Sequence, residues 1–327
     1  MHNILILANA VVPNGNPDEY DTFIQAQDIN EALKNLGINS DIIFLPEKVS
    51  KLNDILAENA EITIFNLVEN DESKNLIQTS ANLLKHLNIP FTGCSPDSLL
   101  ITNNKTVSKS IMKSYGILTP SWLDCNQKYN IELKEKYIIK LNDEHASVDI
   151  DATSIIKPKT FADLNKELSK KTQTGKKFFA EEFVEGREFN VSIIGGKDNF
   201  EILPVGEILF DSEIFINREK IVDYNAKWNS LSPEYQGTPR SFSCNSLEPE
   251  LMKRLKEITE LCWKIFKLNG YARVDFRCDN DNNLYVLEIN ANPCIAKDSG
   301  LAAAAAEAKY SYAKLIEIII KNPLTWN

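Results

Sequence analysis

Near the C-terminal end of the sequence, charged and polar side chains alternate with apolar ones in two short segments. The segments are Arg273-Val-Asp275-Phe-Arg and Tyr285-Val-Leu-Glu288-Ile-Asn290, separated by a turn rich in Asp and Asn. On β-strands, a period of two places Arg273 and Asp275 on one face, and Glu288 and Asn290 on one face of the partner strand. We therefore expect four polar groups to converge on one side of a hairpin.

Two carboxylates and a carboxamide oxygen suit Mg²⁺, which proteins normally bind with one or two carboxylates together with substrate phosphates. The sequence therefore predicts Asp275, Glu288 and Asn290 as metal ligands. Arg273 adds a cation for a transferring phosphoryl group or a developing oxyanion. The alternative is a surface hairpin whose charges form cross-strand ion pairs. The apolar residues between the polar ones indicate instead a strand pair that is buried on its other face.

The elements that must position this hairpin form a mixed α/β pattern. In the first ninety residues, short apolar runs alternate with amphipathic stretches, which is typical of a parallel sheet with helices. A last short strand is predicted at 88–93, and a domain boundary follows it. The next block is a small α+β unit that begins with a helical pattern at 98–115 and is rich in lysine within an acidic chain.

The remainder reads as a second set of strands and helices. An alternating strand at 188–194 precedes a long polar segment at 211–239, and such loops inside compact domains are usually functional or mobile. An amphipathic helix at 249–268 leads into the hairpin, and an Ala-rich helix at 301–320 closes the sequence. The predicted domains are 1–95, 96–180 and 181–327.

Bulk properties narrow the class of protein. A chain of 327 residues exceeds what one hydrophobic core usually supports. A net charge of -10 disfavours contacts with nucleic acid or anionic membranes, since both need a basic surface. The N-terminus lacks the basic start of a signal peptide, no apolar run approaches the ~20 residues that span a bilayer, and the cysteines form no CxxC pair. We therefore expect a cytoplasmic protein with free thiols.

Four stretches of the sequence resemble the ATP-grasp ligases of the D-alanine:D-alanine ligase group, in that family's order. They are the string from Tyr271 to Leu301, Glu181-Glu-Phe-Val-Glu-Gly-Arg-Glu188-Phe, Pro90-Phe-Thr-Gly-Cys-Ser with Asn104-Lys105, and Asp223-Tyr-Asn-Ala-Lys227-Trp228. The resemblance covers residues 90–301 well and the first ninety weakly. It implies a three-domain ATP-grasp fold with an N-terminal parallel-sheet domain, a small middle lid domain and a C-terminal antiparallel-sheet domain, and with ATP between the last two.

The resemblance also implies residues that hold the nucleotide. Glu181 would accept a hydrogen bond from the adenine amino group, and Glu188 would accept hydrogen bonds from the ribose hydroxyls. Phe183 and Val184 would supply the linker between them, including backbone contacts to adenine.

Three lysines would contact the phosphates. The resemblance places Lys105 and Lys140 on the middle domain, each as a point charge on a flexible stem. Lys227 would belong to a mobile loop that closes over the γ-phosphate and keeps water away from an acyl phosphate. Without the resemblance, Lys140 and Lys227 could equally be ordinary surface lysines.

Several positions depart from the family's pattern near the substrate. After Lys140 the family has a Gly- and Ser-rich loop, whereas residues 144–149 here read Glu-His-Ala-Ser-Val-Asp. Ser147 could still donate to a phosphate, while Asp149 would repel one unless it points away. Cys294 stands where the family has a glycine, and Ser299 keeps the place of a serine near the substrate carboxylate. Cys294 as a nucleophile is an alternative, but phosphorylation by ATP makes a thiol step unnecessary.

The N-terminal part departs further. The glycine pair and the substrate-side histidine of true D-alanine ligases are absent. Asp18 or Glu19 could hold an ammonium group. His145 is the only histidine near a motif, and a solvent-exposed loop position is its expected environment.

These features predict an ATP-dependent carboxylate–amine ligase that forms an amide or peptide bond through an acyl phosphate. The expected cofactors are ATP and Mg²⁺, with Mn²⁺ as an alternative metal. The expected partners are amino acid or small peptide substrates, with a homodimer left open. One alternative is D-alanine:D-alanine ligase proper, although the departures predict poor activity with D-alanine alone. Another is a non-catalytic ATP-binding regulatory protein, against which the retained metal-ligand types and Lys140 argue.

Overall fold

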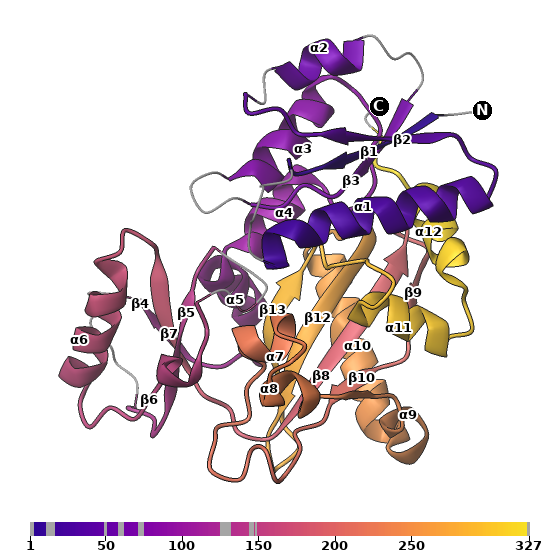
Figure 1. Cartoon of the computed structure of the whole chain (residues 1–327). Helices are drawn as coiled ribbons and strands as arrows, with labels where there is room; N and C mark the ends of the chain where they lie inside the picture. The colour runs from indigo at the N-terminus through magenta and orange to yellow at the C-terminus, as the bar shows by residue number, and fades with distance from the viewer. Residues whose placement is uncertain are drawn as a thin grey trace.

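Three β-sheets organise the chain in a computed structural model that describes residues 3–10, 17–48, 51–57, 62–70, 75–124, 132–143, 147 and 149–325 (Figure 1). The N-terminal sheet has the order β2-β1-β3 and is parallel throughout. Its strands are β1 (Asn3–Ala8), β2 (Ser40–Phe44) and β3 (Ile62–Asn66), and its helices are α1 (Pro17–Asn35), α2 (Leu52–Ala57) and α3 (Leu76–His86). This arrangement confirms the parallel N-terminal sheet.

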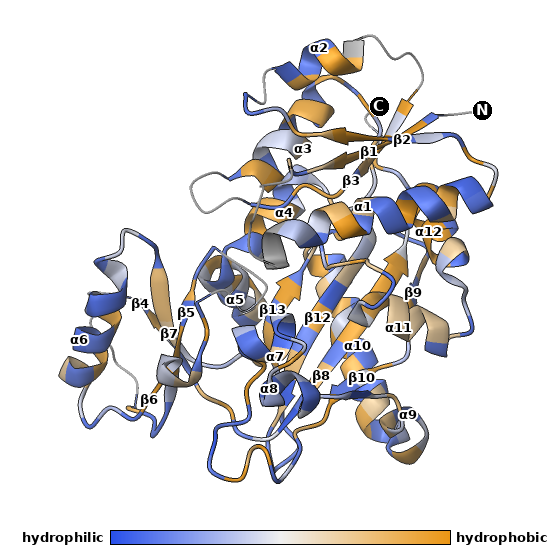
Figure 2. Cartoon of the chain, viewed as in Figure 1, coloured by the Kyte–Doolittle hydropathy of each residue, from blue (hydrophilic) through white to orange (hydrophobic). Residues whose placement is uncertain are grey.

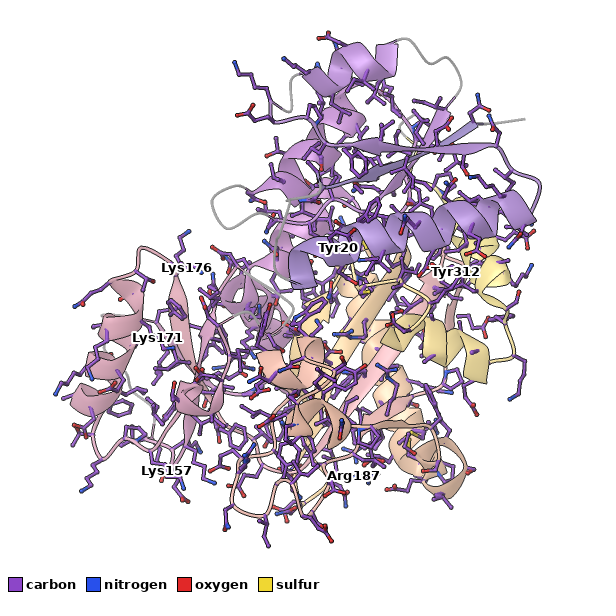
Figure 3. The ribbon with its side chains drawn as sticks, in the orientation of Figure 1. Tyr20, Lys157, Lys171, Lys176, Arg187 and Tyr312 are labelled. Atoms are coloured by element: carbon purple, nitrogen blue, oxygen red, sulfur yellow. The ribbon has the colours of Figure 1, made fainter. Side chains whose placement is uncertain are left out.

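A small four-stranded sheet stands apart from the other two sheets (Figure 1). Its order is β4 (Trp122–Asp124), β7 (Phe178–Glu182), β5 (Tyr137–Leu141) and β6 (Ile155–Ile156), and a short 3₁₀ turn, η2 (Ala152–Ser154), precedes β6. Helix α6 (Phe161–Thr172) begins at a capping box and buries Leu164 and Leu168 against the sheet. Lys157, Lys171 and Lys176 lie around this unit (Figure 3).

The third sheet carries the predicted hairpin. All its pairings are antiparallel, in the order β11-β10-β8-β12-β13, with β9 paired to β8. The strands are β8 (Arg187–Gly195), β9 (Phe200–Ile202), β10 (Gly206–Ile208), β11 (Arg240–Ser241), β12 (Gly270–Cys278) and β13 (Leu284–Asn290). Val274 and Phe276 of β12 share a buried core with Leu255 and Trp263 of α10 (Pro249–Ile265). The apolar face of the hairpin therefore lies against a helix, and its polar face is left for a site.

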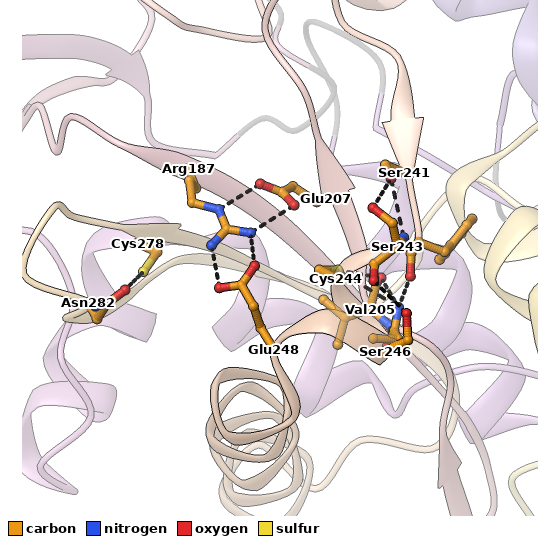
Figure 4. Close-up of polar contacts among 12 residues, drawn as sticks. Arg187, Val205, Glu207, Ser241, Ser243, Cys244, Ser246, Glu248, Cys278 and Asn282 are labelled. Carbon is orange, nitrogen blue, oxygen red and sulfur yellow. Dashed lines mark hydrogen bonds and ion pairs between the residues drawn. The ribbon is translucent and has the colours of Figure 1, made fainter.

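Arg187, the first residue of β8, ties three elements together (Figure 4). Its guanidinium donates to both oxygens of Glu207 on β10, at 2.7 and 2.9 Å. It also donates to both oxygens of Glu248, which directly precedes α10, at 2.8 and 2.7 Å. The bidentate geometry fixes where β8 starts relative to its neighbours.

Three predicted elements differ from the structure. The helical pattern at 98–115 is two helices, α4 (Pro96–Asn103) and α5 (Lys105–Ser114), because the Asn104 side chain caps the second one. The predicted strand at 88–93 is only an isolated bridge at Phe91.

The predicted helix at 301–320 is likewise two helices, α11 (Gly300–Glu307) and α12 (Tyr312–Ile320). Lys309 has a φ of 68° between them, and Ser311 caps α12. The break lets Leu315 and Ile319 of α12 join the same core as Ile29 of α1.

The long polar segment contains the short helices α7 (Tyr224–Trp228) and α8 (Pro233–Gln236), and α9 (Cys244–Leu247) follows β11. Strands β1 and β13 consist largely of hydrophobic residues, shown in orange, whereas much of α6 is hydrophilic (Figure 2). Within the described ranges, no helix combines the length and the apolar character needed to cross a bilayer. The domain limits 1–95, 96–180 and 181–327 stay predictions.

Candidate active site

A cavity of about 760 Å³ lies between α1, the small sheet and the polar face of the third sheet. Apart from Asp18 and Glu19, whose side chains lie outside the described residues, the residues that the sequence predicted for the site line it. These residues are Lys105, Lys140, Ser147, Glu181, Phe183, Val184, Glu188, Lys227, Arg273, Asp275, Glu288, Asn290 and Ser299. The structure thus brings together positions that span almost two hundred residues of sequence, although their individual roles stay predictions.

The hairpin places its four polar groups on one face, as predicted. Arg273 lies opposite Asn290 and Asp275 lies opposite Glu288 in the register of β12 and β13. Arg273 Nε donates to Asp275 Oδ1 and Nη2 donates to Oδ2, both at 2.7 Å. Asn190 on β8 also donates to Asp275 Oδ1, at 2.8 Å. Burial opposes the charge of Arg273, but Asp275 holds the pKa of the guanidinium above its ordinary value.

Lys105 reaches the hairpin from the start of α5. Its Nζ lies 3.4 Å from Glu288 Oε2. Asn104 Oδ1 accepts from the Val107 amide at 3.0 Å, and the Lys105 amide donates to the Asn142 carbonyl at 3.1 Å. The helix start and the end of β5 therefore position Lys105 together.

Glu181 on β7 is 1% exposed and is surrounded by cations. Lys140 Nζ lies 2.7 Å from Glu181 Oε1, and Lys109 of α5 forms an ion pair with Oε2. Burial raises the pKa of Glu181, but the two lysines together hold it below its ordinary value. Sequence reasoning missed Lys109. Its spacing of four from Lys105 on one helix face is the signal that could have found it.

Glu188 on β8 is paired with Arg277 of β12, whose Nη2 lies 2.9 Å from Glu188 Oε2. Burial raises the pKa of Glu188. The Arg277 guanidinium also lies 5.7 Å from the Phe183 ring centroid. One cation therefore contacts both Glu188 and Phe183, two of the residues predicted to contact the nucleotide.

The segment 144–149, which differs from the family's Gly- and Ser-rich loop, has two described residues in the left-handed backbone region that favours glycine. Ser147 and Asp149 have φ values of 60° and 58°. Ser147 Oγ donates to the Val222 carbonyl at 2.8 Å, and Asp149 Oδ2 lies 3.0 Å from Lys176 Nζ. Asp149 therefore has a cation of its own. Glu144, His145, Ala146 and Val148 lie outside the described residues.

Lys227 and Ser299 approach the cavity from helix termini. Lys227 is in α7, which Asp223 caps by accepting from the Ala226 amide at 2.8 Å. Burial lowers the pKa of Lys227, and the charge of Arg273 lowers it further. Ser299 caps α11, where its Oγ accepts from the Ala302 amide at 3.1 Å.

The end of the cavity next to α1 holds a carboxylate that sequence reasoning missed. Asp21 lines the cavity, and Cys294 Sγ donates to its Oδ1 at 3.6 Å. Gln25, one turn along α1, donates to Asp21 Oδ2 at 2.8 Å and accepts from the Ile295 amide at 3.0 Å. This polar i, i+4 pair on α1 is the available sequence signal. The side chains of Asp18 and Glu19 lie outside the described residues.

Cys294 is a poor nucleophile in this environment. Burial raises the pKa of its thiol well above the ordinary value, and the Asp21 carboxylate raises it further. Because the thiolate is the reactive form, the geometry favours a packing role.

Comparisons with known proteins agree with this geometry. A family model described as "D-ala D-ala ligase C-terminus" matches residues 124–321. D-alanine–D-alanine ligase of Aquifex aeolicus is 32% identical over 74% of this chain and 76% of the relative. The enzyme of the same name from Maridesulfovibrio salexigens is 30% identical over 90% of this chain and 91% of the relative.

The fold is also that of a solved enzyme. The D-alanine–D-alanine ligase of Bacillus anthracis complexed with ATP superposes with a TM-score of 0.74, at 21% identity, over 98% of this chain and 97% of that chain. The chain therefore belongs to the D-alanine–D-alanine ligase family of ATP-grasp enzymes and is an ATP-dependent ligase that forms amide bonds.

Proposed function

We propose that this ligase uses Mg²⁺ to activate an amino acid or small peptide carboxylate as an acyl phosphate, and that an amine of a second amino acid or peptide then displaces the phosphate. The observation that carries the proposal is the single polar face on which Arg273, Asp275, Glu288 and Asn290 meet inside one cavity. A surface hairpin with only cross-strand ion pairs does not account for that burial, because Asp275 is 6% exposed and Asn290 8%.

The nucleotide fits the part of the cavity next to the small sheet. Phe183 and Val184 flank this part, and Glu181 and Glu188 lie on either side of them. Adenine would donate to Glu181, and the ribose hydroxyls would donate to Glu188. Lys140 would have to release Glu181 to reach the phosphates, since its Nζ lies 2.7 Å from that carboxylate in the structure.

The donor set of the hairpin fits Mg²⁺. Among the residues that the structure describes, Asp275 Oδ1 accepts two hydrogen bonds and Oδ2 accepts one, from Arg273, so Oδ2 would keep a lone pair for a metal. Within the described ranges, no three His, Cys, Asp or Glu side chains are placed to hold a metal ion. Two carboxylates and the Asn290 carboxamide would therefore need phosphate oxygens to complete the shell, as is usual for Mg²⁺. When bound, the ion would neutralise charge on the phosphates.

The protein's own part in the reaction is positioning and charge neutralisation. The substrate carboxylate oxygen attacks the γ-phosphorus beside Lys140 and Arg273, the bond to the bridging oxygen breaks, and ADP leaves with the electron pair. The amine nitrogen then attacks the acyl carbon, phosphate leaves with the electrons of the carbon–oxygen bond, and the nitrogen loses a proton. Lys227 and Trp228 line the cavity and would keep water from the acyl phosphate.

Asp21 supports an amino acid substrate. It is a carboxylate of α1 that lines the cavity, close to Cys294 and within the electrostatic reach of Lys227. A substrate ammonium group placed there would pair with Asp21 and lie in front of Ser299 and α11. We assign Asp21 the role that the sequence suggested for Asp18 or Glu19.

The Asp21→Asn variant should bind the amino substrate less tightly. A charged hydrogen bond to an ammonium contributes about 1.5–3 kcal/mol. The KM for the amino substrate should therefore rise by about ten- to a hundredfold, while the KM for ATP stays constant. Steady-state kinetics with each substrate varied in turn measures this. Glu31→Gln, on the exposed side of the same helix, is the control. Equal amino-substrate KM values for Asp21→Asn and the native protein would contradict the assignment.

A substrate panel tests the function as a whole. Release of ADP should require ATP, Mg²⁺ and at least one amino acid or dipeptide, and D-alanine alone should be a poor substrate because Cys294 fills space next to Asp21. Assaying phosphate release over single amino acids and pairs, with product masses determined, checks both points. The relatives' names favour D-alanine as the alternative substrate, and efficient D-alanyl-D-alanine formation would establish it. Tight ATP binding with no ADP formed over the whole panel would indicate a regulatory protein instead.

A further inference from the structure

A lysine that does not line the cavity contacts the carboxylate that we assign to adenine. Lys109 lies on α5 with a side chain that is 0% exposed. It pairs with Glu181 Oε2, whereas Lys140, which lines the cavity, pairs with Oε1. Each oxygen of Glu181 thus has its own lysine, and of these two lysines Lys140 is the one that lines the cavity.

Lys109 is fixed from its other side as well. Its Nζ donates to Thr119 Oγ1 at 2.8 Å, and Thr119 Oγ1 donates to the Val286 carbonyl on β13 at 2.8 Å. The chain of contacts joins the small sheet, α5 and the strand that carries Glu288. Because a buried ammonium without partners is strongly unfavourable, these contacts with Thr119 and Glu181 hold Lys109 in this position.

We propose that Lys109 is a positioning residue that keeps Glu181 ionised and oriented as a hydrogen-bond acceptor when Lys140 turns towards the phosphates. The inference rests on the assignment of Glu181 to the adenine amino group. With Lys140 displaced, Oε1 is free to accept from that group, and Oε2 remains held by Lys109. The carboxylate then has one oxygen for the protein and one for the base.

The consequence is selectivity among purine nucleotides. An ionised carboxylate accepts from the 6-amino group of ATP but repels the 6-oxo group of inosine triphosphate. A carboxyl group that has lost its buried cation would take up a proton and could donate to the 6-oxo group. Lys109 therefore determines base choice without touching the base.

The test uses the full chain and the two nucleotides. In Lys109→Met, the ratio of kcat/KM for ATP to kcat/KM for inosine triphosphate should fall by about tenfold or more, since a wrongly matched buried polar group discriminates strongly. The KM of the amino substrate should not change. Lys113→Met, one turn further along α5 and exposed, is the matched control and should keep the native ratio.

Equal losses for both nucleotides in Lys109→Met would mean a merely structural role and overturn the inference. If Lys109→Met does not fold, Lys109→Gln retains a donor without the charge and should also lose the ratio, whereas Lys109→Arg should restore it. A native ratio in Lys109→Gln would overturn the inference too. The Glu181→Gln variant distinguishes a failure of the adenine assignment from a failure of the role proposed for Lys109. If it keeps the native ratio, the adenine assignment itself fails, and if it alone loses the ratio, only the role of Lys109 fails.

Discussion

The Glu288→Gln variant should lose turnover by about a thousandfold, because the substitution removes one of the two carboxylates that we propose as Mg²⁺ ligands. Electrostatic groups aimed at a transferring phosphoryl group typically contribute about 10²–10³ in kcat. The change is nearly isosteric, so the strand pairing of Glu288 with Asp275 should survive. Release of ADP in the presence of ATP, Mg²⁺ and the best substrate of the panel measures the effect.

A second measurement separates metal binding from a loss of structure. Native protein should bind ATP more tightly with Mg²⁺ than with EDTA, and Glu288→Gln should lose most of that difference when binding is measured by calorimetry. Glu201→Gln is the control, since Glu201 is an exposed residue of β9 in the same sheet. If Glu288→Gln turned over like native protein, Glu288 would not be a metal ligand.

Within residues 181–188, we expect Gly186→Ala to be the single substitution that lowers the free energy of unfolding most. Gly186 directly precedes β8 with a φ of +133°, and a Cβ there would lie 2.0 Å from the Cys278 carbonyl oxygen. That neighbour is backbone of β12, so relief requires strands to separate. The Arg187 ion pairs with Glu207 and Glu248 hold the start of β8 against such a shift. We expect a loss of about 3 kcal/mol or more in the free energy of unfolding.

Gly175→Ala provides the matched comparison for this prediction. Gly175 also has a positive φ, of +84°, but nothing lies within 4 Å of a Cβ placed there. Its cost should be limited to the strained backbone, about 1 kcal/mol. Urea unfolding followed by circular dichroism measures both variants. Similar midpoints for the two would show that β12 yields to the extra methyl group.

Much of the site could be predicted because its residues occur in short strings with local geometry. The alternation around Arg273 and Asp275 sufficed to place four polar groups on one face, since a strand has a period of two whatever surrounds it. The sequence likewise predicted the parallel N-terminal sheet. Two of its errors were at breaks in helices, where Asn104 and Lys309 interrupt patterns whose apolar periodicity continues across them, and the third was the strand at 88–93, where Phe91 forms isolated bridges.

Other features depend on contacts between distant segments. Asp21 was missed because only the packing of α1 over the third sheet brings it to Cys294, more than two hundred and seventy residues later. Lys109 was missed because it lies on α5 whereas its partner Glu181 lies on β7 of the small sheet, and a buried lysine looks like a surface lysine until that partner is known. We expected Asp149 to repel a phosphate, but Lys176 forms an ion pair with it, and the local sequence did not indicate this pairing.

The sequence by itself determined the alternation that places four polar groups on one face of the hairpin and the family to which the chain belongs. Local periodicity and short-range capping were enough for that. Only the tertiary structure decided that Asp21 lines the cavity, that Lys109 pairs with Glu181 and that Cys294 contacts Asp21. Those outcomes follow from desolvation and from pairing across separate elements, and both exist only once the three sheets have packed.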